Sequence, residues 1–322
     1  MLRRLLMGLA VSAMLFGAVE VGLRLAGWPA ADPTRKFAHN EIYWSTEPDL
    51  HLDPFDHKEM GTVFHVSTDK NGVRAPLHPQ EKPDGVTRVM TLGCSTTFGW
   101  GVEDDQTYPA RLESILTAEG HKVEVINGGQ PGHSSFQGLW FWDRTLHAYH
   151  PDVVIFGYIV QDSRKVAYTD RSQAILQGNG DFLKRNLLYN LKLYLALRQF
   201  VQGDSIVSKE QGEVFRVPPA DYVQNIRDFK TRIDAVGAKM VLFGFPLERA
   251  GYTTDHRALL AAAAADDALG HPPLYDPQPD METWSAQQSL YFPQDRGHAN
   301  AAGNDRIAQG MAQFLVAHKL VP

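Results

Sequence analysis

The segment VMTLGCSTTFGWGVEDDQTYP, residues 89–109, runs from an apolar, strand-like stretch through a turn of small residues toward a helix. The turn is GCSTT, residues 93–97, and it stands at the C-terminal end of the apolar stretch. A tight connection between a strand and a helix needs small residues, which is one interpretation of this composition. The other interpretation is that the turn presents a nucleophilic side chain, Ser95.

Short β-rich runs alternate with amphipathic segments along the rest of the chain. The strand-like runs are RVMTLG (88–93), VEVINGG (123–129), DVVIFGYIV (152–160) and KMVLFGFP (239–246), and the helical patterns include TYPARLESILTAEG (107–120), SSFQGLWFWDRTLHAY (134–149) and HRALLAAAAADDALG (256–270). This alternation is typical of βαβ units, in which helices cover both faces of a buried parallel sheet. We therefore expect a doubly wound α/β domain over residues 86–322.

The composition excludes several classes of function. The 322 residues carry a formal net charge of -6, and no Lys/Arg-rich run occurs beyond the N-terminus. The chain therefore lacks the basic surface that binds DNA or RNA, and we expect no nucleic-acid partner. Cys94 is the only cysteine, so no internal disulfide can form.

The first 28 residues, MLRRLLMGLAVSAMLFGAVEVGLRLAGW, indicate a membrane segment. Arg3 and Arg4 precede an apolar run over 5–19 that continues more weakly over 21–25, as in a signal peptide or a short membrane anchor. No small-x-small cleavage site follows, which favours an uncleaved anchor; a cleaved segment would leave a secreted protein. The two arginines predict a cytoplasmic N-terminus, with the remainder of the chain in the periplasm or outside the cell.

The end of this segment carries residues that suit a membrane boundary. Glu20 and Arg24 lie four positions apart, so we expect them to pair on one face of a helix. Trp28 is expected in the interfacial belt, where its amphipathic ring contacts both lipid and water.

Residues 29–85 are rich in Pro, His, Asp and Lys, and we interpret them as a linker followed by a small β-element packed on the main domain. Asn71-Gly72 is a strong turn signal within this region. HLDPFDH, residues 51–57, contains metal-ligating residue types, but its irregular spacing favours a solvated loop. Further along, the amphipathic segment 183–202 is expected to be a packed helix that covers the ligand-binding edge of the sheet.

Three loops and one C-terminal segment contain the residues that can carry chemistry. In open α/β sheets ligands bind outside the carboxyl ends of the strands, where GCSTTFG, NGGQPGHSS and VQDSRK are expected. In the C-terminal segment PQDRGHANAAG, Asp295 and His298 precede a helical pattern. An Asp-x-x-His spacing can hold the carboxylate against one imidazole nitrogen, and the other nitrogen is then free to accept a proton from a serine.

From about residue 88 to residue 315 the chain resembles the SGNH, or GDSL-type, serine hydrolase superfamily. Its four blocks occur here in family order: the turn at Ser95, an Asn-x-x-x-x-Gly loop at 127–132, a third block at 159–162, and the Asp-x-x-His pair. In the first block the matching positions are Gly93, Ser95, Thr97, Phe98, Gly99, Gly101, Thr107, Tyr108 and Pro109. The resemblance implies a flavodoxin-like sheet flanked by helices.

The resemblance also implies catalytic roles. Ser95 corresponds to the nucleophile, His298 to the general base and Asp295 to the residue that orients it. The oxyanion hole would consist of the N–H groups of Ser95 and Gly132 and a side chain from the third block, Gln161. No metal or organic cofactor is implied.

Two positions depart from the family pattern. Cys94 stands where the family usually has Asp, and Gln161 occupies the position of an Asn, with Ile159 in place of a glycine. The glutamine amide can still donate a hydrogen bond, but its extra methylene changes its reach.

Other residues in these loops allow two interpretations. Cys94 is either a second nucleophile or, as we favour, a small packing residue. His133 either lines the substrate cleft or is a surface loop histidine. The glycines at 128, 129 and 132 lack the G-x-G-x-x-G spacing, which argues against dinucleotide binding.

Together these features predict a membrane-anchored serine hydrolase that cleaves an acyl ester. Family habit and the expected location suggest a short acyl group on a carbohydrate in the periplasm. An O-acyltransferase would use the same acyl-enzyme but pass the acyl group to a sugar hydroxyl. A non-catalytic polysaccharide-binding or assembly protein on the same fold is the third alternative.

Overall fold

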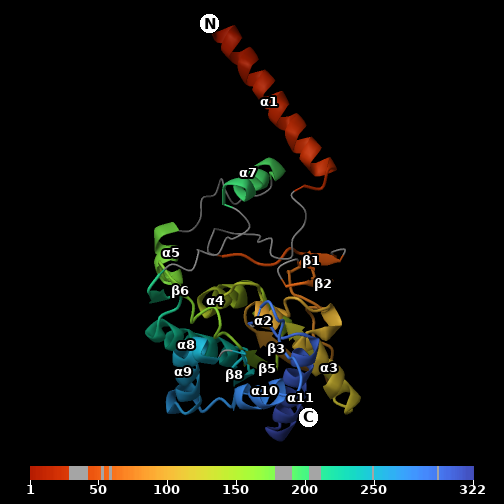
Figure 1. Cartoon of the computed structure of the whole chain (residues 1–322), viewed down its shortest axis with the longest axis vertical. Helices are drawn as coiled ribbons and strands as arrows, with labels where there is room; N and C mark the ends of the chain where they lie inside the picture. The colour runs from red at the N-terminus through yellow and green to blue at the C-terminus, as the bar shows by residue number, and fades with distance from the viewer. Residues whose placement is uncertain are drawn as a thin grey trace.

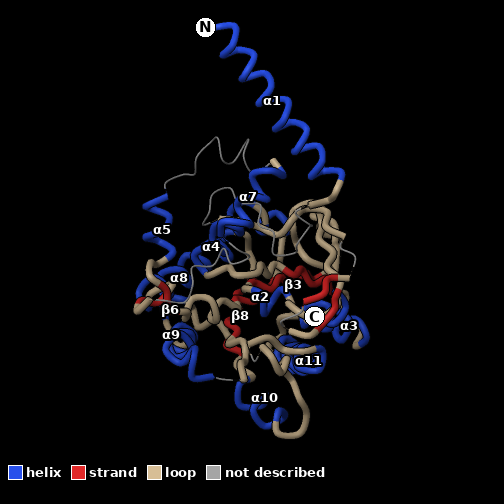
Figure 2. Tube along the Cα trace, turned by 45° about the horizontal axis from the view of Figure 1, so that its top comes forward, coloured by secondary structure: helices blue, strands red, loops and turns tan. Residues whose placement is uncertain are grey.

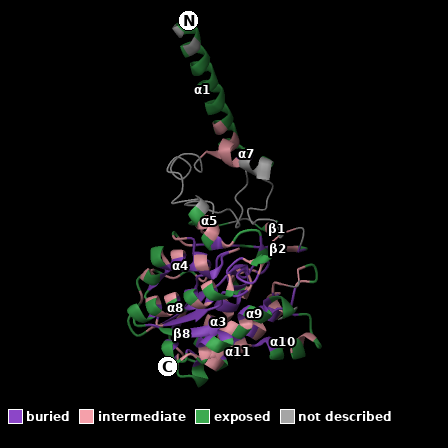
Figure 3. Cartoon of the chain, turned by 90° about the vertical axis from the view of Figure 1, so that its left-hand side faces the viewer, coloured by how far each residue is buried: buried purple, intermediate pink, exposed green. Residues whose placement is uncertain are grey.

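The computed structural model describes residues 1–28, 43–51, 54–57, 60–177, 191–202, 212–248, 250–295 and 297–322. A long N-terminal helix, α1 (Leu2–Leu25), projects from a compact body that contains the strands and most of the other helices (Figure 1). Residues 6–25 of this helix are long and apolar enough to cross a membrane. The helix is exposed along almost its whole length, whereas the strands of the body are buried (Figure 3).

The body is built on one five-stranded sheet. Its strands are β3 (Thr87–Leu92), β4 (Val123–Asn127), β5 (Val153–Phe156), β8 (Lys239–Phe243) and β9 (Leu274–Tyr275). They lie in the order β4-β3-β5-β8-β9, and every neighbouring pair is parallel. The predicted doubly wound, flavodoxin-like parallel sheet is therefore confirmed. The two-residue strand β9 was not predicted, because it is too short to produce a hydrophobic period.

Helices cover both faces of the sheet. Alternate strand residues point to opposite faces, so Met90 and Leu92 pack against one layer of helices and Val89 against the other. The first layer contains α4 (Ser135–Arg144), α8 (Pro219–Ala235) and α9 (Thr254–Ala264), and the second contains α3 (Tyr108–Ala118), α10 (Gln278–Ser285) and α11 (Ala301–Ala317). Figure 2 shows the strands between these helices. The arrangement places the loops after β3, β4, β5 and β8 at one edge of the sheet.

The region before β3 packs on that edge. Strands β1 (Phe55–His57) and β2 (Thr62–Phe64) form an antiparallel hairpin, and a cluster that includes Phe64 packs against Phe98 and Trp100, just after the GCSTT turn. The predicted Asn71-Gly72 turn is present. Gly72 has φ +75°, and a Cβ there would lie 2.3 Å from the carbonyl oxygen of Thr46, so the turn requires glycine.

A further group of short elements follows β5. These are β6 (Lys165–Val166), which pairs with β7 (Val214–Phe215), and the helices α5 (Asp170–Gln177) and α7 (Lys192–Gln202). The remaining elements of the described residues are the short helix α2 (Ser95–Phe98) and the single 3₁₀ turns η1 (Asp104–Gln106), η2 (Leu146–Tyr149), η4 (Ala250–Thr253) and η5 (Asp267–Leu269).

Part of segment 183–202, which was predicted to cover the sheet edge, is described as α7: its Tyr194 and Leu195 pack against Trp44, whose Nε1 donates to the carbonyl of Pro131 in the loop after β4. Residues 183–190 lie outside the described residues, but α7 itself lies beside α1 (Figure 1). Glu20 on α1 accepts hydrogen bonds from the backbone N–H groups of Lys192 (2.9 Å) and Leu193 (2.8 Å) and pairs with Arg24 (2.8 Å), as its spacing predicted. Leu197 and Phe200 of α7 are exposed, whereas Ala196 is buried, so only one side of α7 packs on the body.

Candidate active site

Ser95 lies at the point where β3 turns into the short helix α2. The turn is possible because residue 93 is glycine: a Cβ there would lie 2.1 Å from Oγ1 of Thr97. Cys94 follows in an extended conformation, and Ser95 is the first residue of α2. The side chain of Ser95 is 9% exposed, so it is buried except where it meets the cleft.

The structure brings Ser95 together with the two C-terminal residues predicted to act with it. Nε2 of His298 lies 2.8 Å from Oγ of Ser95, and Nδ1 of His298 lies 2.5 Å from Oδ2 of Asp295. The other oxygen of Asp295 accepts a hydrogen bond of 3.0 Å from the N–H of Gly297. These contacts form a continuous chain of hydrogen bonds from carboxyl to hydroxyl.

The electrostatics of Asp295 determine the direction of these hydrogen bonds. Burial acts to raise the pKa of this carboxyl, but the hydrogen bond and charge of His298 and the N–H of Gly297 hold the pKa below its usual value. An ionised carboxylate can only accept, so Nδ1 of His298 carries the proton. In the neutral imidazole Nε2 is then the acceptor, and the Ser95 hydroxyl donates to it.

The segment that carries His298 is fixed from both sides. Its backbone bridges back to the segment before it, where the N–H of Phe292 donates to the carbonyl of His298 (3.2 Å). After it, the side chain of Asn300 caps α11 by accepting from the N–H of Gly303 (3.0 Å). One turn later Asn304 accepts from the N–H of Tyr108 at the start of α3 (3.0 Å), which joins the two halves of the site.

A cleft of about 450 Å³ opens above these side chains. Four of the predicted site residues line it: Ser95, Gln161, Asp295 and His298. The other lining residues are Thr96, Val160, Arg164, Leu247, Tyr252 and Gly297. The cleft therefore places a mixed polar and apolar surface beside the serine hydroxyl.

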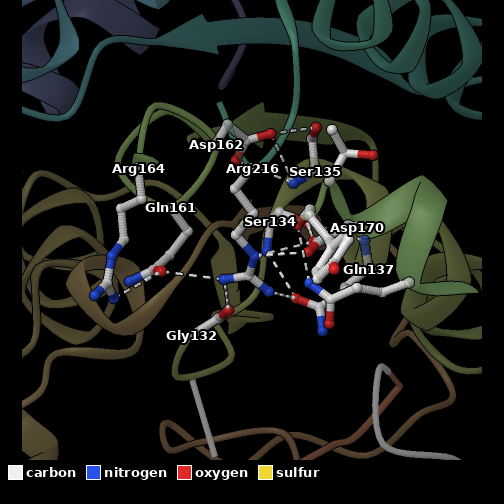
Figure 4. A network of polar contacts seen from close by, with 12 residues as sticks. Gly132, Ser134, Ser135, Gln137, Gln161, Asp162, Arg164, Asp170 and Arg216 are labelled. Carbon is white, nitrogen blue, oxygen red and sulfur yellow. Dashed lines mark hydrogen bonds and ion pairs between the residues drawn. The ribbon is translucent and has the colours of Figure 1, made fainter. Parts of the chain in front are cut away.

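Gln161 lies at the edge of the cleft with its amide held in one orientation. Its Oε1 accepts hydrogen bonds from Nη1 of Arg216 (3.1 Å) and from Nη1 of Arg164 (3.3 Å) (Figure 4). Guanidinium groups only donate, so the amide oxygen must face them and the amide nitrogen must point elsewhere. Such an orientation leaves Nε2 as a hydrogen-bond donor near the cleft.

Gly132 occupies the loop after β4 and is not among the residues that line the cleft. It has φ +76°, a conformation that favours glycine. Its carbonyl accepts from Nη1 of Arg216 (2.7 Å), and the carbonyl of the preceding Pro131 accepts from Nε1 of Trp44 (3.1 Å). Because C=O and N–H point in opposite directions across a trans peptide, the N–H of Gly132 points away from Trp44.

Two residues with open interpretations are buried. Burial raises the pKa of the Cys94 thiol, whose sulfur lies 3.2 Å from Oγ1 of Thr96, and Cys94 does not line the cleft. His133 is fully buried, and its Nε2 lies 2.7 Å from the carbonyl oxygen of Trp44. Both predictions for His133, a cleft residue and a surface loop residue, are therefore wrong, because segment 43–46 covers this loop.

The HLDPFDH segment is only partly described, since residues 52–53 lie outside the described residues. The ring of His57 packs edge-on against Trp100, and its Nδ1 accepts from the N–H of Met60 (3.2 Å). Within the described ranges no group of three or more His, Cys, Asp or Glu side chains is arranged to hold a metal ion.

Three buried polar residues support the site: Asp162, which belongs to the third block, and Arg216 and Asp170, which no motif indicated. Arg216 and Asp170 form an ion pair of 2.8 Å, and both are almost completely buried. Asp162, beside Gln161, is fully buried and accepts from the N–H (3.0 Å) and the hydroxyl of Ser135. Burial raises the pKa of the Asp162 carboxyl to about 7. Arg216 lies 55 positions after Gln161 in a segment without a recognisable motif, so only the folded chain shows its role.

No family model matches the chain, and no curated protein matches it in sequence. Among solved structures it is similar to a lipase/acylhydrolase from Enterococcus faecalis, with 17% identity over 73% of this chain and 97% of that chain and a TM-score of 0.48. It is also similar to the acetyl xylan esterase AlAXEase (15% identity, 71% and 99% of the two chains, TM-score 0.48). A third similar structure is the psychrotrophic esterase EstA from Pseudoalteromonas sp. (14% identity, 70% and 95% of the two chains, TM-score 0.45).

Proposed function

We propose that this chain is a serine-dependent acyl-ester hydrolase with Ser95 as its nucleophile. The observation that carries the proposal is the hydrogen-bonded chain from Asp295 through His298 to the Ser95 hydroxyl at a cleft of about 450 Å³. A half-buried carboxylate whose pKa is held below its usual value, an imidazole and a hydroxyl in this order form the arrangement that activates serine for acyl transfer.

In the proposed reaction, Ser95 Oγ attacks the carbonyl carbon of the ester as its proton moves to Nε2 of His298. The resulting imidazolium is stabilised by Asp295 and then gives the proton to the leaving alcohol. Water attacks the acyl-enzyme by the same route, with His298 again acting as the base. The N–H groups of Ser95 and Gly132 and Nε2 of Gln161 are proposed to stabilise the negative charge that develops on the carbonyl oxygen.

The cleft supports a short acyl group attached to a polar alcohol. Val160 and Leu247 provide apolar contacts, while Arg164 and Tyr252 provide hydrogen-bond donors on the same cleft. A cleft of this volume accommodates a small substrate portion beside the serine. We therefore propose an acylated carbohydrate as the substrate class.

The membrane location is part of the same proposal. The apolar helix α1 and the arginines at positions 3 and 4 support an anchor with its N-terminus in the cytoplasm and the catalytic domain in the periplasm. The exposed Leu197 and Phe200 on α7, which lies beside α1, would contact the lipid surface. Membrane fractionation with an intact N-terminus is expected, and a mature chain that begins near Ala31 by mass spectrometry would contradict the anchor.

The decisive experiment is covalent labelling of Ser95. A fluorophosphonate probe should label the wild-type chain and not Ser95→Ala, and hydrolysis of an aryl acetate should disappear in the same variant. Ser12→Ala, on the exposed helix α1 and outside the body, is the control for loss of a hydroxyl. Equal labelling of wild type and Ser95→Ala would exclude this function.

Transfer of the acyl group to a sugar hydroxyl would proceed through the same acyl-enzyme. With an acylated donor and a free oligosaccharide together, mass spectrometry separates the two reactions: hydrolysis releases the free acid, whereas transfer yields an acylated oligosaccharide.

A further inference from the structure

A buried guanidinium lies between the two loops that carry the proposed oxyanion donors. Arg216, immediately after β7, is 5% exposed. Its Nη1 donates to the carbonyl of Gly132 (2.7 Å) in the loop after β4 and to Oε1 of Gln161 (3.1 Å) in the loop after β5 (Figure 4). One nitrogen atom therefore joins both loops.

The guanidinium is itself held in a single orientation. Its Nε donates to both oxygens of Asp170 (2.8 and 3.0 Å), and its Nη2 donates to Oε1 of Gln137 (2.6 Å). Asp170 in turn accepts from the hydroxyl of Ser134 (2.5 Å) at the start of α4. All three guanidinium nitrogens are engaged, and the planar group cannot rotate without breaking charge-assisted hydrogen bonds.

The consequence for Gln161 follows from its side-chain length. Glutamine has one more rotatable bond than the asparagine that the resemblance leads us to expect, so its amide has more conformations to lose. Hydrogen bonds from Arg216 and Arg164 to Oε1 select the conformation in which the oxygen faces the two guanidinium groups. The position of the amide oxygen is thereby fixed, and the position of Nε2 is fixed with it.

The consequence for Gly132 is similar. The carbonyl of Gly132 is held by Arg216, and the carbonyl of Pro131 is held by Trp44. The peptide planes on both sides of Gly132 are therefore fixed, and with them the direction of its N–H. A glycine at φ +76° would otherwise have more conformational freedom than any other residue.

We propose that Arg216 is a positioning residue that orients two oxyanion donors at once, the N–H of Gly132 and Nε2 of Gln161. This inference rests on the proposed hydrolase function. It also gives a physical reason why a longer glutamine can serve where the family pattern has asparagine, because the guanidinium restricts the additional rotation.

The test compares Arg216→Lys with Arg88→Lys in the full-length protein. Lysine keeps the positive charge beside Asp170 but has one nitrogen, which cannot reach both loops and the carboxylate together. Arg88 is an equally buried guanidinium that pairs with Glu124 at the opposite end of β3, so its variant controls for loss of a buried hydrogen-bond network. Arg216→Lys should lower kcat for an aryl acetate by about 10-fold to 1000-fold with KM nearly unchanged, and Arg88→Lys should leave kcat within about threefold.

A double-mutant cycle with Gln161→Ala separates positioning from general destabilisation. If Arg216 acts partly through Gln161, the combined variant should lose less activity than the product of the two single losses. Arg216→Lys activity within about threefold of wild type, or fully multiplicative losses in the double variant, would overturn the inference. Equal activity of wild type and Ser95→Ala would instead show that the proposed function fails.

A second measurement does not depend on turnover. Hydrogen exchange followed by mass spectrometry should be faster in peptides that cover 128–135 and 157–164 in Arg216→Lys than in wild type or Arg88→Lys. Unchanged exchange in both peptides would show that the two loops keep their positions without the guanidinium, and it would exclude the positioning role.

Discussion

Nε2 of His298 lies 2.8 Å from Oγ of Ser95, although 203 positions separate the two residues in the chain. The contact exists because α3, which follows the Ser95 turn, packs beside α11, which follows His298. The hydrogen bond from the N–H of Tyr108 to Asn304 ties the beginnings of these two helices together. The site thus depends on the packing of one helix layer as much as on the two motifs.

Substitutions of the imidazole and the carboxylate should affect turnover to different degrees. His298→Ala should lower kcat by at least about 1000-fold, because among the described residues it is His298 whose imidazole lies within hydrogen-bond distance of the Ser95 hydroxyl. Asp295→Asn should retain more activity, since it preserves the geometry and loses tautomer control and imidazolium stabilisation. His318→Ala, an exposed histidine at the end of α11, is the control. Full turnover by His298→Ala in steady-state assays would contradict the mechanism.

Gln161 should contribute to the transition state more than to substrate binding. We expect Gln161→Ala to lower kcat by roughly 100-fold to 1000-fold with little change in KM. Gln161→Asn keeps the donor and shortens its reach, so a partial loss would indicate that Arg216 has adapted the loop to glutamine. If Gln161→Ala stayed within a few-fold of wild type, backbone N–H groups alone would form the oxyanion hole.

Asp162 should make the stability of the fold dependent on pH. The pKa of its carboxyl is raised to about 7 by burial, whereas an unfolded aspartate has a pKa of about 3.9. Its contribution to stability is therefore fully present below about pH 4 and is lost as the pH rises through 7. Asp162→Asn removes this pH-dependent loss of stability. The difference between the folded and unfolded pKa of the carboxyl limits the loss to about 4 kcal/mol of unfolding free energy.

The measurement is thermal unfolding of wild type and Asp162→Asn at pH 4.5 and pH 8 in the same detergent. The difference in Tm should shift in favour of the variant as the pH rises. A difference that stays constant between the two pH values would show that the folded carboxyl is already ionised at pH 4.5.

The N-terminal helix should not be needed for folding or activity of the rest of the chain. A chain without residues 1–28 should remain folded and active, because the sheet and the proposed triad lie downstream of α1.

Trp44→Ala should lower kcat in the full-length chain, because Nε1 of Trp44 holds the carbonyl of Pro131. Trp28→Ala is the matched control outside the body. Activity of Trp44→Ala equal to that of wild type would show that the Gly132 loop does not need this contact.

The hydrophobic pattern was sufficient to predict four of the five strands of the sheet and several of the helices that cover it. Alternating apolar runs and amphipathic segments reflect local periodicity. In a parallel sheet that is buried on both faces, each strand of sufficient length is a continuous apolar run that can be recognised in the sequence. The turn at Ser95 and the Asp-x-x-His spacing are also local features. Contacts within three or four positions are determined by the geometry of the turn, so Asp295 and His298 could be paired from their spacing alone.

Tertiary structure decided what lies around those motifs. The orientation of the Gln161 amide depends on Arg216, the burial of His133 depends on Trp44, and the place of α7 depends on Glu20 of α1. Each contact joins residues far apart in the chain, for which no periodicity or spacing exists. Such contacts form only when separate elements pack against one another, because hydrogen bonds between distant groups become favourable once packing has removed them from water.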